Sequence, residues 1–158
     1  MKKEEIIKVI ISALLLIVIM FIYINNEQYK EKTVLKKQTV ENIKFEKSKI
    51  NIYMFWGDGC PHCEELAKYL YKLNKVYGKS YNLYTLEVWH NNKNNNLMSQ
   101  FASTKNEEVS GVPYLVIGNK TFIGYSEKQN KKIEDAIKKE IKNKNHTDIY
   151  KSILEATK

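Results

Sequence analysis

The sequence predicts an α/β fold in which a mixed β-sheet is flanked by helices and is preceded by a transmembrane helix. Between about residues 49 and 143, short apolar runs typical of buried strands alternate with segments whose apolar residues recur every three or four positions. This alternation favours a sheet with helices on both faces. Residues 6–24 are apolar except for Lys8 and Ser12, which predicts the additional helix.

The length of 158 residues allows one domain with appendages. The formal net charge is +8, and all 26 basic residues are lysines spread along the chain. Proteins that read nucleic acids concentrate positive charge on one face and use arginine for base contacts, so we expect no nucleic-acid partner. The diffuse charge fits either weak attraction to an anionic membrane surface or a lysine-rich solvated surface.

Residues 1–24 are predicted to form a signal anchor. Their apolar run of 19 residues is close to the roughly 20 that a bilayer-spanning helix needs. Lysines precede the run, but it ends in bulky residues rather than the small residues of a cleavage site, and no cysteine follows it. It also lacks the polar face of a buried core helix. We therefore expect a single pass through the cell membrane, with the N-terminus in the cytoplasm and the domain that follows extracytoplasmic.

Two polar segments flank the predicted domain. Residues 25–48 are charged and lack glycine and proline, which is typical of a stalk, and Val40, Ile43 and Phe45 are candidates for a first strand. Residues 144–158 form a C-terminal tail whose apolar residues are spaced as in one short helix.

The domain, residues 49–143, begins with an apolar, aromatic strand at 50–56. The strand is ended by Gly57 and Gly59, which follow it. A helix follows from Cys60, with Pro61 at a favoured first position and Gly78 as its stop. Its apolar face consists of Cys63, Leu66, Ala67, Leu70 and Leu73. A second strand is predicted at residues 81–89.

The second half of the domain is predicted to contain a hairpin between two helices. Residues 91–96 are an asparagine-rich loop, and a short helix follows at 97–104. Strands at 114–117 and 121–125 are joined by a glycine-containing turn, which predicts a hairpin. A last amphipathic helix is marked by Ile133, Ala136, Ile137 and Ile141.

The Cys-Pro-His-Cys segment at residues 60–63 is the candidate reactive site. At a strand-to-helix junction, the backbone N–H groups and the dipole of the helix N-terminus stabilise a thiolate on Cys60. Cys63 lies one turn further on, where it can form a disulfide with Cys60 and resolve a mixed disulfide. The alternatives are a static disulfide and half of a metal site that includes His62.

Residues 50–143, about three-fifths of the chain, resemble the thioredoxin superfamily. The matching pieces are Phe55-Trp56, the Cys-Pro-His-Cys segment, Gly111-Val112-Pro113, the hairpin around Asn119 and the last helix. The resemblance implies that Pro113 is cis and faces the cysteines. It also implies that the backbone of Val112 binds a substrate strand, and Trp56 is expected to lie near the same site.

Some positions depart from the thioredoxin pattern. Met54 stands where thioredoxins carry a buried acid, and Gly59 stands where they carry tryptophan. The Pro61-His62 dipeptide is similar to that of the oxidising DsbA-like branch, but the 23 residues between Trp89 and Pro113 are too few for the helical insertion of that branch.

The imidazole of His62 would further stabilise the Cys60 thiolate, and a stabilised reduced form makes the disulfide a stronger oxidant. Reference potentials run from about −270 mV for thioredoxin to about −120 mV for DsbA, a difference of roughly 7 kcal/mol. We expect the couple of this protein to lie well above the thioredoxin value.

The predicted function is that of a membrane-anchored thiol–disulfide oxidoreductase that exchanges disulfides with protein substrates, in the oxidising direction. It needs no cofactor and no metal, and a membrane or exported redox partner recharges the cysteines. One alternative is a reductase, for example in cytochrome maturation or thiol repair. Others are a membrane-tethered copper- or zinc-binding module and a non-catalytic adhesion domain.

Overall fold

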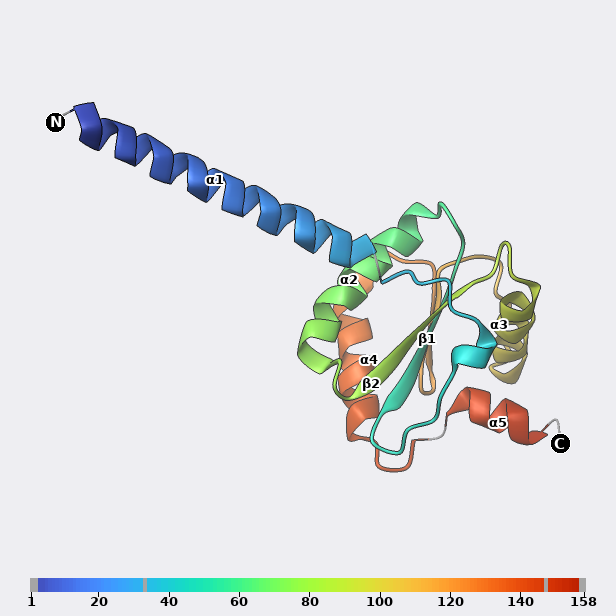
Figure 1. Cartoon of the computed structure of the whole chain (residues 1–158). Coiled ribbons are helices and arrows are strands. Elements are labelled where there is room, and N and C mark those ends of the chain that lie inside the picture. Colours follow the sequence, from blue (N-terminus) through green and yellow to red (C-terminus); the bar gives the residue numbers. More distant parts are fainter. Residues whose placement is uncertain (1–2, 33, 147, 157–158) are drawn as a thin grey trace. The chain divides into compact units, whose positions relative to one another are not determined.

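The computed structural model describes residues 3–32, 34–146 and 148–156. The chain divides into two units, Met1–Thr33 and Val34–Lys158. The first consists of helix α1 (Lys3–Lys32), drawn in blue in Figure 1. Its stretch Lys3–Asn26 is long and apolar enough to cross a membrane, and none of it is buried. Met1 and Lys2, the start of the predicted signal anchor, lie outside the described residues.

The second unit is built on a four-stranded mixed sheet in the order β2-β1-β3-β4. The strands are β1 (Ile50–Trp56), β2 (Tyr81–Glu87), β3 (Tyr114–Ile117) and β4 (Lys120–Ile123). β1 pairs with β2 in parallel and with β3 antiparallel, and β4 forms a hairpin with β3. The parallel pair requires a crossover, which helix α2 (Pro61–Tyr77) supplies. The predicted fold class is confirmed.

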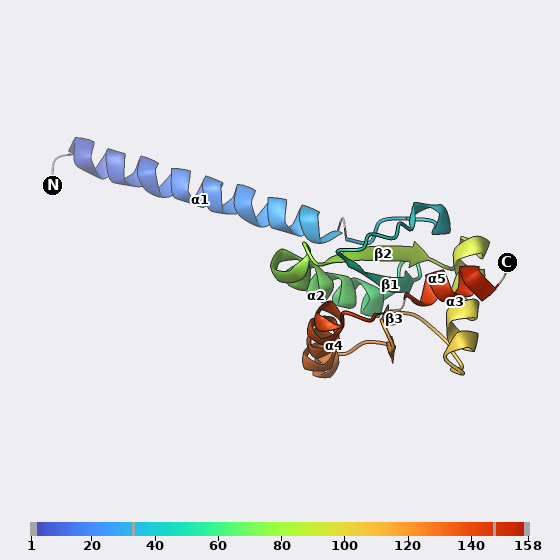
Figure 2. The same cartoon turned by 90° about the horizontal axis from the view of Figure 1, so that it is seen from below.

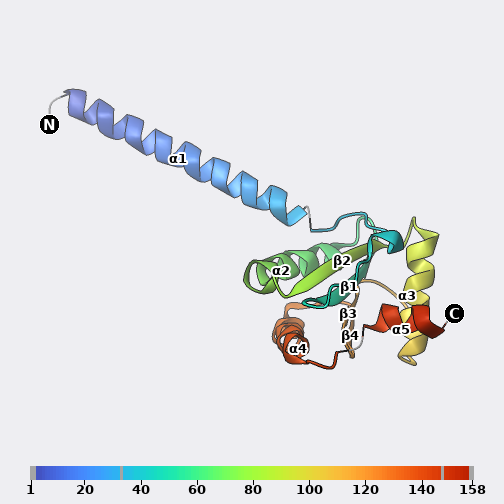
Figure 3. The ribbon, with the colours of Figure 1, turned by 60° about the horizontal axis from the view of Figure 1, so that its bottom comes forward.

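Helices cover both faces of this sheet, as Figures 2 and 3 show. α2 and α4 (Asn130–Lys142) lie on one face, and α3 (Asn92–Thr104) and α5 (Ile149–Ala156) lie on the other. All seven residues of the central strand β1 are buried, and they alternate between the two faces. Met54 and Trp56 pack in the core under α2, whereas Tyr53 and Phe55 pack under α3.

Helix α3 begins five residues earlier than the sequence predicts. The asparagine-rich segment at 91–96 is not a loop, because Asn91 caps the helix and accepts a hydrogen bond from the Asn94 amide at 3.1 Å. Asn94 is fully buried, and its side-chain amide donates to the backbone oxygens of Gln38 and Glu87, both at 2.9 Å. The polar composition suggested a loop, but Asn91 and Asn94 have specific hydrogen-bonding roles that begin the helix and anchor it.

The segment 34–42 runs along the open edge of β2. Gln38 forms a parallel bridge with Leu86, and its side chain accepts the Thr85 N–H at 2.8 Å. The predicted strand at Val40–Phe45 is therefore wrong: Val40–Asn42 is a 3₁₀ helix, and the edge pairing occurs just before it. This segment protects the β2 backbone from pairing with another chain.

The C-terminal tail contains the predicted short helix, α5, and this helix completes the core. Asp148 accepts hydrogen bonds from the N–H groups of Tyr150 and Lys151 and from the buried Tyr53 hydroxyl at 2.9 Å. Burial and the adjacent carboxylate raise the pKa of Tyr53. The Tyr150 ring also stacks on Phe45, with centroids 5.9 Å apart. Residues 147, 157 and 158 of the tail lie outside the described residues.

Candidate active site

The two cysteines lie where β1 leads into α2. The chain leaves Trp56, turns through Gly59 at φ 79°, a conformation that favours glycine, and enters the helix with Cys60 as its N-cap. Pro61 occupies the first helical position. Cys60 and Cys63 form a disulfide with their Cα atoms 5.3 Å apart. This spacing of one helical turn agrees with the prediction from the sequence.

The two sulfurs differ in their surroundings. Cys63 is fully buried and belongs to the core cluster that also contains Met54, Leu66 and Tyr125. Cys60 keeps 7% of its surface exposed, at the start of the helix. An incoming thiolate can therefore approach only the Cys60 side, and the apolar surroundings of Cys63 disfavour a charge there.

A backbone donor is already aimed at the Cys60 sulfur. The N–H of Cys63 donates to Cys60 Sγ at 3.2 Å. When the disulfide is reduced, the same N–H and the positive end of the helix dipole stabilise a thiolate on Cys60. The site thus stabilises a charge on the accessible sulfur and disfavours it on the buried one.

The Val112–Pro113 segment lies against the cysteines. The Val112–Pro113 peptide bond is cis, and the carbonyl oxygen of Val112 is 3.9 Å from Cys60 Sγ. Val112 is partly exposed, whereas Pro113 is buried at the start of β3. This is the placement that the resemblance implied. The role of Val112 in holding a substrate strand stays a prediction.

His62 points along the helix surface. Its side chain is 67% exposed, and its Nδ1 lies 3.2 Å from a carboxylate oxygen of Glu65. The imidazole therefore has a carboxylate partner on the same face of the helix. Its influence on the redox pair stays a prediction.

A shallow groove of about 420 Å³ starts at Val112 and is the candidate client-binding groove. Its lining is formed by Val88, Trp89, Asn95, Met98, Val109, Ser110, Gly111 and Val112. Trp89 is 56% exposed, and its indole lies so close to Gly57 that a Cβ at position 57 would collide with it. Trp56, which the sequence analysis expected near the site, is buried in the same core cluster as the cysteines, and its role in substrate binding stays a prediction.

The molecule has a thioredoxin-like fold. The order of the strands, the cysteine pair at the N-terminus of α2 and the proline opposite it agree with that arrangement. This arrangement brings together the groups needed for thiol–disulfide exchange. Among the described residues, no three His, Cys, Asp or Glu side chains gather as a metal site.

Comparisons with known proteins gave one solved structure of interest, the solution structure of an uncharacterized thioredoxin-like protein from Clostridium perfringens. The two chains are 26% identical, with a TM-score of 0.49, and the match covers 70% of this chain and 84% of the other. No protein-family model and no curated protein matches the chain.

A buried carboxylate that the sequence pattern does not reveal lies beside the active-site loop. Glu87 ends β2 opposite Trp56, and its side chain is 5% exposed. Burial acts to raise the pKa of Glu87, but hydrogen bonds from the backbone N–H groups of His90 and Trp89 outweigh burial and hold the pKa below its usual value. The only sequence signal was a glutamate at the end of an otherwise mostly apolar strand.

Proposed function

We propose that this protein is a membrane-anchored, extracytoplasmic thiol–disulfide oxidoreductase that oxidises protein thiols through Cys60 and Cys63. The observation that carries the proposal is the disulfide at the N-terminus of α2, in which Cys60 keeps 7% of its surface exposed and Cys63 is fully buried. The groove is lined by Val112, whose carbonyl oxygen lies 3.9 Å from Cys60 Sγ, so a protein substrate in the groove lies close to that sulfur.

The reaction proceeds in two exchanges. A client thiolate attacks Cys60 Sγ, the Cys60–Cys63 bond breaks, and the departing Cys63 sulfur takes up a proton. A second client thiolate then attacks the client sulfur of the mixed disulfide, and Cys60 leaves as a thiolate. Two electrons pass from the client to the cysteine pair, and a membrane or exported redox partner removes them afterwards.

The surroundings of the cysteines favour the oxidising direction. The Cys63 N–H and the helix dipole stabilise the Cys60 thiolate, which is the leaving group of the second exchange. The fully buried Met54, in the strand before the site, supplies no acid or base near the pair. A stabilised reduced form raises the reduction potential of the couple.

The redox potential tests this direction. The full-length chain in detergent micelles is equilibrated with glutathione buffers, and the fraction of disulfide is read by thiol alkylation and mass spectrometry. We expect a two-electron couple that lies well above the value of about −270 mV for thioredoxin. A potential at or below that value would reject the oxidising direction and favour the reductase alternative.

The membrane orientation has its own test. In a chain with Cys60→Ser and Cys63→Ala, a new cysteine is introduced at the exposed Lys47 or, as the matched control, at the exposed Glu4. We expect a membrane-impermeant maleimide to label Lys47→Cys in intact cells and Glu4→Cys only after lysis. The reverse pattern would place the redox domain in the cytoplasm.

A further inference from the structure

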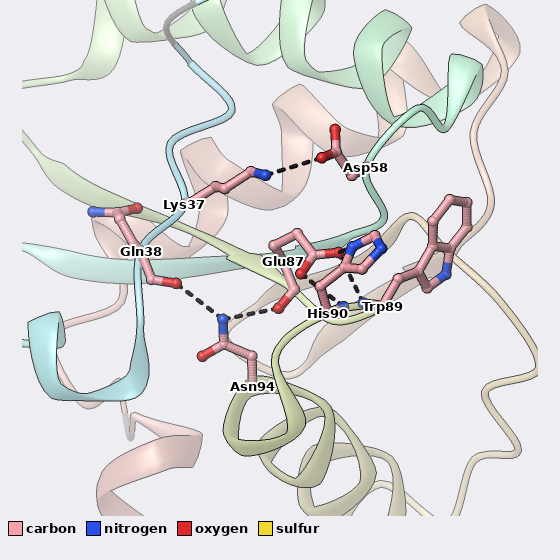
Figure 4. A network of polar contacts seen from close by, with 7 residues as sticks. All are labelled: Lys37, Gln38, Asp58, Glu87, Trp89, His90 and Asn94. Atoms are coloured by element: carbon pink, nitrogen blue, oxygen red, sulfur yellow. Dashed lines mark hydrogen bonds and ion pairs between the residues drawn. The ribbon is translucent and has the colours of Figure 1, made fainter.

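The turn after β2 is built around the carboxylate of Glu87, as Figure 4 shows. One carboxylate oxygen accepts the N–H of Trp89 at 2.9 Å, and the other accepts the N–H of His90 at 3.0 Å. The His90 ring also lies over the carboxylate, with Nδ1 3.3 Å from it. Two consecutive backbone amides are thus fixed by one buried side chain.

We propose that Glu87 is a positioning residue of the client-binding groove, and that it holds Trp89 as a wall against which a client packs an apolar side chain next to its cysteine. This inference rests on the proposed function. Glu87 itself touches neither the client nor the cysteines. It acts through the backbone of Trp89, whose indole points away from the polar cluster in Figure 4.

The indole is joined to the active-site loop by a close approach. It lies on Gly57, where only a residue without Cβ leaves room for it. The carbonyl of the same Gly57 accepts the N–H of Cys60 at 3.1 Å. A shift of the turn would therefore move the groove wall away from the loop that presents the reactive sulfur.

One further contact holds this turn, and another holds the neighbouring active-site loop. Asn94, at the start of α3, donates to the Glu87 backbone oxygen at 2.9 Å. From the edge segment, Lys37 forms an ion pair with Asp58 at 2.9 Å, on the loop between Gly57 and Cys60. That pair is exposed and contributes little by itself. The turn is therefore held by the buried Glu87 carboxylate together with the buried Asn94 side chain.

The chemistry at Glu87 requires an ionised acceptor. Both of its oxygens face N–H groups, which a carboxylate satisfies without a donor of its own. In Glu87→Gln, one of the two oxygens becomes an NH₂ group that faces an N–H, so one hydrogen bond is lost. Glu87→Ala loses both, and the Asn94 hydrogen bond to the backbone oxygen of residue 87 remains.

The test compares clients that differ only beside the cysteine. The full-length chain in detergent micelles oxidises two dithiol peptides, one with phenylalanine and one with serine before the first cysteine. Glutathione disulfide regenerates the Cys60–Cys63 disulfide after each turnover, and reduced glutathione serves as the small thiol for comparison. The variants are Trp89→Ala, Glu87→Ala and Glu87→Gln. The matched control is Asp148→Asn, another carboxylate that accepts two backbone N–H groups but caps α5 instead.

We expect the phenylalanine-to-serine ratio of kcat/KM to fall about tenfold in Trp89→Ala, as for the loss of one packed aromatic contact. Glu87→Ala should lower this ratio nearly as far, through a higher KM for the phenylalanine peptide. The ratio in Glu87→Gln should lie between those of Glu87→Ala and the parent. Asp148→Asn should keep the parent ratio. A role of Glu87 in stability alone would leave the ratio unchanged, because folded molecules would still bind clients normally.

Three results would overturn the inference. The first is an unchanged ratio in Glu87→Ala when the ratio falls in Trp89→Ala. The second is an unchanged ratio in Trp89→Ala itself. The third is a fall in Asp148→Asn as large as in Glu87→Ala. If the parent chain oxidises neither peptide and does not react with glutathione, the proposed function fails as well, which is a distinguishable outcome.

Discussion

Cys63→Ala is expected to capture client proteins as mixed disulfides on Cys60 and to reduce turnover by on the order of a thousandfold. In this variant the Cys60 thiolate attacks a client disulfide and expels one client thiolate, and the mixed disulfide persists because the buried Cys63, whose thiol would displace the client, is absent. Turnover is lost because Cys60 alone cannot form the internal disulfide that oxidises a client. The adducts should be visible on non-reducing gels, and mass spectrometry should locate them on Cys60.

Cys60→Ser is the matched control for this experiment. It keeps Cys63, which is fully buried, so we expect neither turnover nor client adducts. Adducts on Cys63 in this variant would contradict the assignment of Cys60 as the attacking sulfur. Turnover retained in either variant would contradict a dithiol mechanism.

The reactive pair could be predicted from the sequence because its determinants are local. Two cysteines three apart after an apolar strand, with proline at the first helical position, specify a helix N-terminus with adjacent sulfurs. The opposing proline was placed only by resemblance. The structure has it opposite the pair because β3 runs antiparallel to β1, which brings residues 112 and 60 together.

The parts of the site that the sequence did not reveal depend on contacts between distant segments. Glu87 falls within the predicted strand at 81–89, and nothing in the strand pattern distinguishes it. Its burial depends on the turn that follows, whose Trp89 and His90 N–H groups it accepts. Trp89 was read as a strand residue. Its place in the groove depends on the loop before Pro113, some 20 residues later, and on α3, whose start the asparagine run had hidden.

Phe101→Ala is expected to lower the free energy of unfolding by about 3–5 kcal/mol, the range for truncation of a buried aromatic ring. Phe101 is fully buried on α3 and meets the Tyr53 and Phe55 rings edge to face, with centroids at 4.9 and 5.3 Å. Urea unfolding of the full-length chain in micelles, followed by near-ultraviolet circular dichroism, measures the change. Val76→Ala, at a 69% exposed position on α2, should change stability by no more than about 0.5 kcal/mol.

The same variant separates stability from redox chemistry. Phe101 belongs to the core between the sheet and α3, whereas both cysteines belong to the core on the α2 face, so β1 lies between the two sites. We therefore expect the reduction potential of Phe101→Ala to equal that of the parent, although its unfolding midpoint falls. A potential shift as large as the stability loss would show that the two cores act as one unit. A stability loss below about 1 kcal/mol would show that the space left by the ring is refilled, because a cavity at this position costs more.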